Sequence, residues 1–276
     1  MTILHALVLG LVQGATEFLP ISSSGHLVWV PKALGWPAAP ASFDVLVHFG
    51  TLLALTAFYR RDVWALVRGC AAWFRRRRGA SGEHEAERSS RRLVWLLVIG
   101  TLPAGVVGVT LRRPVESLLT SEHIGPVASF LVLSGVLAWF VHWRSAPGKR
   151  AEAMTVADAL LIGLAQACAL MPGLSRSGST IALGVACGLG RREAARFAFL
   201  LAFPAILGAT ALEAKELIGL RSTEALSYAV GLVAAVVSGY LAITVVLALL
   251  QRHVYYVFAI YCVVLGVVLL FWELAT

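Results

Sequence analysis

The sequence predicts an all-α integral membrane protein with six transmembrane helices and two re-entrant helical hairpins in an inverted-topology repeat. Three observations predict this class. Of the 276 residues, 59% are hydrophobic and 14% are charged, whereas soluble domains are about 45–50% apolar and about 25% charged. The long apolar segments suit helices that cross a hydrocarbon core about 30 Å thick. Finally, one polar, helix-breaking motif occurs twice, which indicates a repeat.

The first repeat is expected over residues 1–150 and begins with a re-entrant hairpin. Residues 3–19 form an apolar helix that Pro20 ends, and a short second helix runs from near Ser24 to Leu34. Because the first helix is short and is followed by a polar turn, we expect it to enter the membrane and return. Non-helical backbone is tolerated at that depth only when protein or a water-filled cavity surrounds it. The three crossings of this half are expected at residues 43–59, 93–111 and 124–143, with an interfacial helix over 63–74.

Residues 75–92, RRRRGASGEHEAERSSRR, are expected to form a basic cytoplasmic loop. Ten of the 23 Lys and Arg residues lie between Arg60 and Arg92, and cytoplasmic loops carry such an excess. The arginine run is interpreted as a topology determinant, with an anionic-lipid site as the alternative. The same bias accounts for the net charge of +8, so no nucleic-acid partner is expected.

The second repeat is expected over residues 151–276. A re-entrant helix over 157–171 ends at Pro172 and Gly173, and a helix over 179–188 completes the hairpin. The crossings are expected at 193–218, interrupted by Pro204, and at 226–250 and 254–272. The segment ALVLGLVQ at 6–13 aligns with ALLIGLAQ at 159–166. Three crossings in each half place the halves in opposite orientations, with both termini outside and both hairpins near the midplane.

Glu17 is the most unusual residue of the first hairpin. A carboxylate at the centre of a membrane helix costs about 2.5–3.5 kcal/mol on insertion scales. Gln13 lies one turn earlier on the same helical face. The turn SSSGH at 22–26 then supplies three hydroxyls and His26. We therefore expect a functional site at this break.

SRSGST at 175–180 is the corresponding turn of the second hairpin. Arg176 offers a planar, permanently charged set of donors. The small residues around it expose backbone N–H groups, and a helix N-terminus favours anions. Together the two hairpins predict a site for a diphosphate group.

Each of these residues also has a structural interpretation. Arg176 can act as a positive-inside charge or pair with Glu17, and Ser23 and His26 can cap or pack the hairpin. His48, on the first crossing, is interpreted as packing or as support for the site. Gln13 and Gln166, which occupy equivalent positions in the two repeats, can serve as hydrogen-bonding residues of the repeat.

QGATEFLPISSSGH and PGLSRSGST resemble the two signature regions of the undecaprenyl-diphosphate phosphatase family, integral membrane enzymes associated with bacitracin resistance. Gln13 and Glu17 match the family's pattern of Glu or Gln, three residues and Glu. Residues 172–177 match its Pro-Gly-x-Ser-Arg-Ser motif. The similarity covers essentially the whole chain. Many members carry Glu at the position of Gln13, so a metal or proton role is not carried over to that residue.

The resemblance implies hydrolysis of undecaprenyl diphosphate to undecaprenyl phosphate and inorganic phosphate, which recycles the lipid carrier of peptidoglycan synthesis. It implies a divalent cation, Mg or Ca, held partly by Glu17. The implied catalytic residues are Glu17, Ser23, His26 and Arg176, and the implied substrate-binding residues are Gln13, Ser22, Ser24, Gly25, Ser175, Ser177, Gly178 and Thr180. The implied location is the bacterial inner membrane, and the charge bias predicts that the site opens to the outer face. The expected partners are the polyprenyl diphosphate and membrane lipids, and a homodimer is left open.

Two mechanisms and one rival function remain open at the level of sequence. Ser23 can attack the terminal phosphorus with His26 as the base, or a water activated by His26 or by the metal can do so. The rival function is a polyprenyl-phosphate flippase that uses the same anion site, because inverted repeats with midplane hairpins are typical of secondary transporters.

Overall fold

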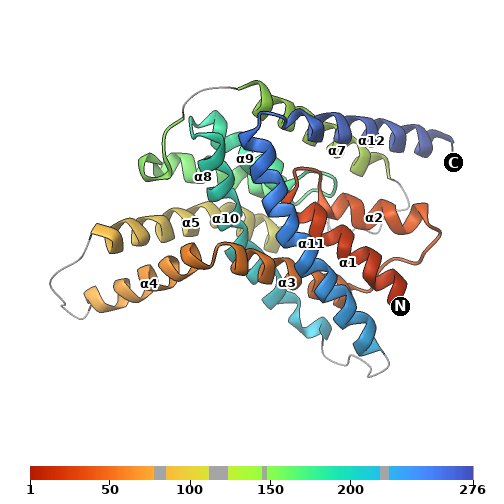
Figure 1. Ribbon diagram of the computed structural model, residues 1–276, viewed down its shortest axis with the longest axis horizontal. Helices are drawn as coiled ribbons and strands as arrows, with labels where there is room; N and C mark the ends of the chain where they lie inside the picture. Colours follow the sequence, from red (N-terminus) through yellow and green to blue (C-terminus); the bar gives the residue numbers. More distant parts are fainter. Residues whose placement is uncertain (78–84, 112–123, 145–147, 218–223, 276) are drawn as a thin grey trace.

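The protein is all-helical in a computed structural model that describes residues 1–77, 85–111, 124–144, 148–217 and 224–275 (Figure 1). Within these ranges, six helices are long and apolar enough to cross a membrane. They are α3 (Ala41–Phe58), α5 (Glu85–Thr110), α7 (Gly125–Trp143), α10 (Arg191–Glu213), α11 (Ala225–Gln251) and α12 (Tyr256–Ala275). The protein is therefore an integral, multi-pass membrane protein, and each expected crossing is confirmed to within a few residues at most ends.

The expected basic loop is shorter than predicted. Helix α4 (Arg60–Arg77) and helix α5 both extend into the segment 75–92, and residues 78–84 lie outside the described residues. The expectation of a loop over the whole of 75–92 is wrong at both ends, because Arg, Glu and Ala are good helix formers even in a highly charged stretch. The interfacial helix expected over 63–74 lies within α4.

Pro204 does not interrupt its crossing, which corrects a second expectation. It lies inside α10, and the helix continues from Arg191 to Glu213. Membrane helices tolerate proline when neighbouring helices and local adjustment satisfy the freed backbone groups. A short 3-10 helix, η2 (Ala214–Leu217), follows directly.

Two pairs of short helices interrupt the series of long ones. The first pair is α1 (Ile3–Phe18) and α2 (Ser23–Ala33), and the second is α8 (Val156–Cys168) and α9 (Arg176–Ala186). A 3-10 turn, η1 (Ala151–Ala153), precedes α8, whose first turn is closed by a capping box between Thr155 and Asp158. Lys149 also binds Asp158 at 2.6 Å.

The two short pairs pack against equivalent partners. Helix α1 packs on α11, and α8 packs on α5. In both contacts two glycines meet: a Cβ added to Gly10 would overlap the backbone of Gly231, and one added to Gly163 would overlap that of Gly100. Small residues let membrane helices approach closely. The short helices are thus fixed by backbone contact with long ones.

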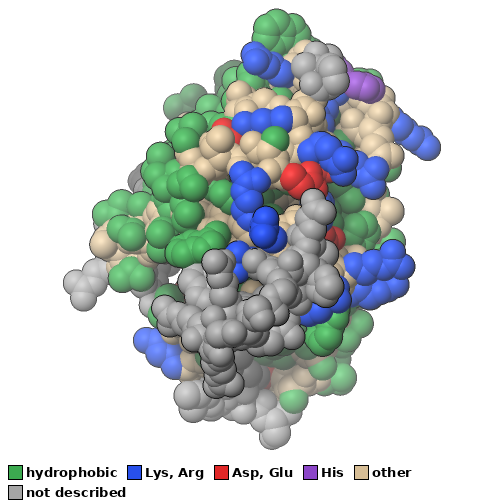
Figure 2. All heavy atoms as spheres, turned by 90° about the vertical axis from the view of Figure 1, so that its left-hand side faces the viewer, with side chains coloured by type: hydrophobic (Ala, Val, Ile, Leu, Met, Phe, Trp, Pro, Cys, Tyr) green, Lys and Arg blue, Asp and Glu red, His purple; other side chains and the backbone are tan. Residues whose placement is uncertain are grey.

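Basic side chains gather at one end of the molecule. Figure 2 views the molecule from the end where α4 ends and α5 begins, and it shows Lys and Arg side chains around that end, with fewer acidic ones among them. At the N-terminal side of α8, Arg92 donates to the backbone carbonyls of Glu152 and Met154. In Figure 1 both chain termini lie at the opposite end of the molecule.

Candidate active site

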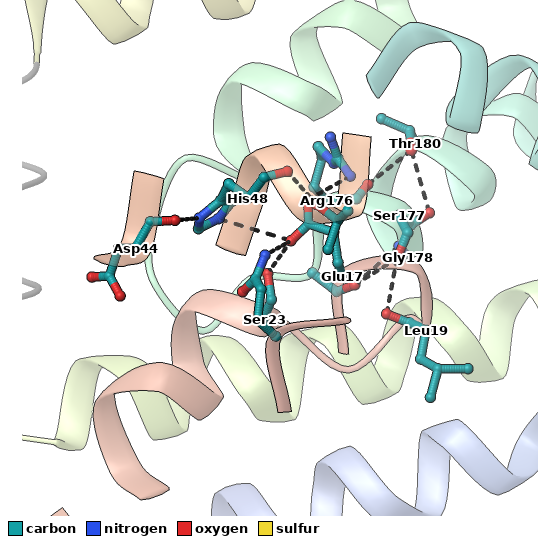
Figure 3. A network of polar contacts seen from close by, with 12 residues as sticks. Glu17, Leu19, Ser23, Asp44, His48, Arg176, Ser177, Gly178 and Thr180 are labelled. Atoms are coloured by element: carbon teal, nitrogen blue, oxygen red, sulfur yellow. Dashed lines mark hydrogen bonds and ion pairs between the residues drawn. The ribbon is translucent and has the colours of Figure 1, made fainter. Parts of the chain in front are cut away.

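Glu17 is the centre of a buried polar cluster between the two short helix pairs (Figure 3). Its Oε1 accepts a hydrogen bond from Arg176 Nη2 at 2.9 Å. Its Oε2 accepts from Ser23 Oγ at 2.6 Å and from Gln13 Nε2 at 2.9 Å. The Glu17 side chain is 6% exposed and that of Arg176 is 18% exposed. The predicted carboxylate, serine and arginine therefore meet in one place.

The first turn brings Ser23 to Glu17 through a strained serine cap. Ser22 is the N-cap of α2, with φ of 68°, and its Oγ accepts from the N–H of Gly25. A positive φ is uncommon for a residue other than glycine and requires support from its surroundings. The turn reverses the chain within four residues of Phe18, and so directs Ser23, the first residue of α2, back to the carboxylate.

The second turn is anchored to α7. The backbone N–H of Ser175 donates to Ser134 Oγ at 2.8 Å, and this hydroxyl donates to the carbonyl of Gly173. Gly173 has φ of +93°, and an added Cβ would overlap the carbonyl oxygen of Val127. Ser175 then caps α9 by accepting from the N–H of Gly178. Arg176 is thus held at the first position of α9, facing α1.

The two turns also touch each other directly. Ser177 Oγ donates to the carbonyl of Leu19 at 3.0 Å. A Cβ added to Gly178 would come within 3.2 Å of the Pro20 side chain. Gly178 therefore allows the two turns to lie close together. This spacing brings the Arg176 guanidinium within hydrogen-bonding distance of Glu17.

The remaining predicted residues stabilise the two turns. Ser22 and Ser24 lie 3.3 Å apart through their hydroxyls, and Ser175 and Ser177 lie 3.2 Å apart. Thr180 donates to the carbonyl of Arg176 in its own helix. Their predicted contacts with substrate stay predictions.

His26 does not contact Ser23 among the described hydrogen bonds. Its Nδ1 donates to the carbonyl of Ser22 at 2.7 Å, so in the neutral ring Nε2 is the acceptor. That nitrogen is 2.7 Å from the hydroxyl of Tyr261 on α12. For His26 to take a proton, as the sequence-based hypothesis requires, Nε2 must first release Tyr261.

His48 lies closer to the cluster than its sequence position suggested. Its Nδ1 donates to the carbonyl of Asp44 at 2.8 Å, and its Nε2 is 3.9 Å from Glu17 Oε2. Its side chain is 35% exposed, so this is an open side of the cluster. His48, which the sequence analysis interpreted as packing or as support for the site, therefore lies beside the carboxylate. Tyr261 was missed as a site residue, and the sequence around it carries no signal that could have identified it.

The described residues offer a few oxygen atoms to a cation. They contain no group of three or more His, Cys, Asp or Glu residues that could hold a metal. Gln13 Oε1, however, is buried without a hydrogen-bond partner beside the Glu17 carboxylate. Amide and carboxylate oxygens suit Mg and Ca, and Mg is often held by one or two carboxylates together with substrate phosphates. The donor set fits a cation whose coordination the substrate completes.

Comparisons with known proteins agree over nearly the whole chain. The family model described as bacitracin resistance protein BacA matches residues 6–268. A protein of Trichlorobacter lovleyi named undecaprenyl-diphosphatase is 39% identical over 270 residues, which cover 97% of this chain and 96% of the relative. Relatives with the same name in Geobacter sulfurreducens and Alcanivorax borkumensis are 40% and 42% identical, and they cover 96% and 97% of this chain and 96% and 98% of their own.

Proposed function

This chain belongs to the bacitracin resistance protein BacA family and is an undecaprenyl-diphosphatase, and from that premise we propose that the cluster around Glu17 is its active site. The enzyme hydrolyses undecaprenyl diphosphate to undecaprenyl phosphate and inorganic phosphate. The observation that carries the site assignment is the convergence of Arg176 and Ser23 on one buried carboxylate. Phosphoryl transfer needs mainly positioning and stabilisation of charge, and this cluster offers both.

Arg176 and the N-termini of α2 and α9 bind the diphosphate. Arg176 has five N–H donors, and its contact with Glu17 uses one of its terminal nitrogens. The serine caps direct the first turns of both helices to the same region, where unpaired backbone N–H groups favour anions. The positive charge of Arg176 then stabilises the charge that develops on the phosphoryl oxygens.

Ser23 is placed to attack the terminal phosphorus, with Glu17 as the acceptor of its proton. The 2.6 Å hydrogen bond already directs that proton to Oε2. The new Ser23 O–P bond replaces the bond to undecaprenyl phosphate, which leaves, and water then cleaves the phosphoserine. Direct attack by a water held near Glu17 remains the alternative. His26 takes a supporting position in this mechanism, because both ring nitrogens have partners.

A divalent cation, Mg or Ca, is part of this proposal. Glu17 and Gln13 Oε1 would hold it together with phosphate oxygens. When bound, the cation would neutralise charge on the diphosphate as a Lewis acid.

We place the protein in the bacterial inner membrane, with the site open to the outer face. The basic end in Figure 2 is assigned to the cytoplasm by the positive-inside rule, and both termini then lie outside. Two oppositely inserted repeats, residues 1–150 and 151–276, account for this arrangement. The short helix of each half packs on a long helix of the other half, α1 on α11 and α8 on α5, and this symmetry supports the repeat. The pairs of glycines that meet in these two contacts support it as well.

The decisive measurement is phosphate release from undecaprenyl diphosphate by the purified protein in detergent. Arg176→Ala should lower turnover at least 100-fold, because removing one preorganised donor to developing charge costs about 100- to 1,000-fold. Size-exclusion and circular dichroism profiles serve as the control for folding. Normal turnover by folded Arg176→Ala would contradict the site assignment.

The same assay separates the mechanisms. A chelator should abolish release, and added Mg or Ca should restore it. With substrate labelled at the terminal phosphate, the wild-type protein should retain label after acid quench, and Ser23→Ala should retain none. Ample turnover by Ser23→Ala would select the water mechanism.

A further inference from the structure

An apolar groove of about 570 Å³ lies on the membrane-facing side of α5. It is formed by one face of that helix between Val98 and Thr110, together with Pro204 of α10. This volume falls within the range of about 300–1,000 Å³ that is usual for sites of small molecules. None of the residues that line the groove is among those assigned to the diphosphate.

The groove presents an almost wholly apolar surface. Leu102, Val106 and Val109 are 57%, 61% and 69% exposed. The two threonines in the lining donate their hydroxyls to carbonyls of their own helix, Thr101 to Leu97 and Thr110 to Val106. Nothing in the lining therefore requires a polar partner.

Gly105 gives the groove its depth, because it has no side chain to fill the space there. A Cβ added there would have no heavy atom within 4 Å. Elsewhere on α5, Gly100 is closed by the backbone contact with α8. The helix thus has one face fixed to the protein and one face that is indented and open to lipid.

The two helices that form the groove also contact the elements that carry the proposed active site. On α5, a Cβ added to Gly108, which lies outside the lining, would be 3.8 Å from the side chain of Leu170, just before the turn that leads to Arg176. Its other wall, Pro204, lies on α10, which packs against α9 and α3. Those helices carry Arg176 and His48. Because α5 runs away from the basic end (Figure 1), the groove lies in its half nearer the chain termini, the side assigned to the outer face.

We propose that this groove binds the polyprenyl chain of the substrate, at isoprene units beyond those next to the diphosphate. The proposal rests on the active site placed at Glu17 and Arg176. A branched apolar chain attached to a diphosphate at the helix tips must continue through hydrocarbon, and this groove is apolar, indented and formed by helices that contact α8 and α9. Ordinary membrane lipids are the alternative occupants, and they would give no dependence on the length of the substrate.

The test fills the groove and compares two substrates. Gly105→Phe adds a side chain into open space. Its control is Val268→Phe, because Val268 is 55% exposed and lies on α12, which supplies no residue of the lining. Gly105→Phe should raise KM for undecaprenyl diphosphate about tenfold and leave its kcat unchanged. The KM for farnesyl diphosphate, which has only the isoprene units next to the diphosphate, should stay at the wild-type value. Val268→Phe should change neither KM.

Two outcomes would overturn the proposal. An unchanged KM for undecaprenyl diphosphate in folded Gly105→Phe means that the chain lies elsewhere. An equal rise of this KM in Val268→Phe means that the effect comes from the surrounding lipid and not from the groove. If Gly105→Phe does not fold, Leu102→Ala with Val106→Ala, which removes groove contacts, should raise the same KM selectively. Loss of turnover on both substrates marks damage to the active site, so failure of the site assignment is distinguishable.

Discussion

At the scale of the residue, Glu17 is a buried charge whose neighbours compensate its burial. An unpaired carboxylate inside a membrane protein is costly, and here both oxygens accept hydrogen bonds, one of them from the positively charged Arg176. In the proposed mechanism, the same bonds that stabilise the charge also place Ser23 and Arg176 for catalysis. Stability and the proposed function would then depend on the same side chain.

A double-mutant cycle should show this coupling. Glu17→Gln and Arg176→Gln should each lower the free energy of unfolding by about 3 kcal/mol, because each leaves an uncompensated buried charge. The double variant should lose less than the sum of the two. Reversible unfolding in detergent measures all three values.

The control for that cycle is the exposed pair Arg150–Glu152, whose side chains are 82% and 55% exposed. Arg150→Gln should cost less than about 1 kcal/mol, as surface pairs usually do. Strictly additive losses for Glu17 and Arg176 would show that the two residues are not energetically coupled.

At the scale of the element, each short pair depends on a turn that its local sequence specifies. Pro20 follows the end of α1, Pro172 and Gly173 lie in the turn after α8 ends at Cys168, and Ser22 and Ser175 cap the helices that follow. These signals are local, so the breaks were predictable. The anchoring of the second turn to Ser134 on α7 was not, because this hydrogen bond joins residues 41 positions apart.

Alanine substitutions at Gly173 and Gly188, which both have φ near +90°, can separate the cost of backbone strain from the cost of lost packing. Gly173→Ala should be the more destabilising, since its Cβ would both occupy a positive φ and overlap the Val127 carbonyl. Gly188→Ala shares the positive φ of about 90° but meets nothing within 4 Å, and should cost about 1–2 kcal/mol from strain alone. Thermal unfolding of both variants measures the difference, and phosphate release should fall in Gly173→Ala. Equal losses in the two variants would remove the role assigned to the α7 contact.

At the scale of the whole molecule, both chain termini lie at one end (Figure 1), and the basic side chains gather at the other (Figure 2). This arrangement agrees with the two oppositely inserted halves that we propose. Each half supplies one side of the site, and neither turn alone holds both the carboxylate and the guanidinium. The proposed chemistry therefore requires both halves of the fold.

Labelling from the two sides of the membrane tests this orientation. In a cysteine-free background, Ala38→Cys in the exposed segment after α2 should react with an impermeant thiol reagent in intact cells. Ala153→Cys, which is also exposed, should react only after permeabilisation. Reaction of both positions from the same side would contradict the assigned topology.

The sequence by itself determined the membrane class, the six crossings, the two helix breaks and the family, because each follows from composition, local motifs or apolar segment length. It also identified Glu17, Ser23 and Arg176 as residues of one site. Only the tertiary structure decided which atoms meet: Arg176 and Glu17 are 159 residues apart, and His26 and Tyr261 are 235 apart. Such contacts depend on how helices pack, and helix packing leaves no local pattern at either residue. The place of His48 beside Glu17 and the groove on α5 were likewise decided by packing.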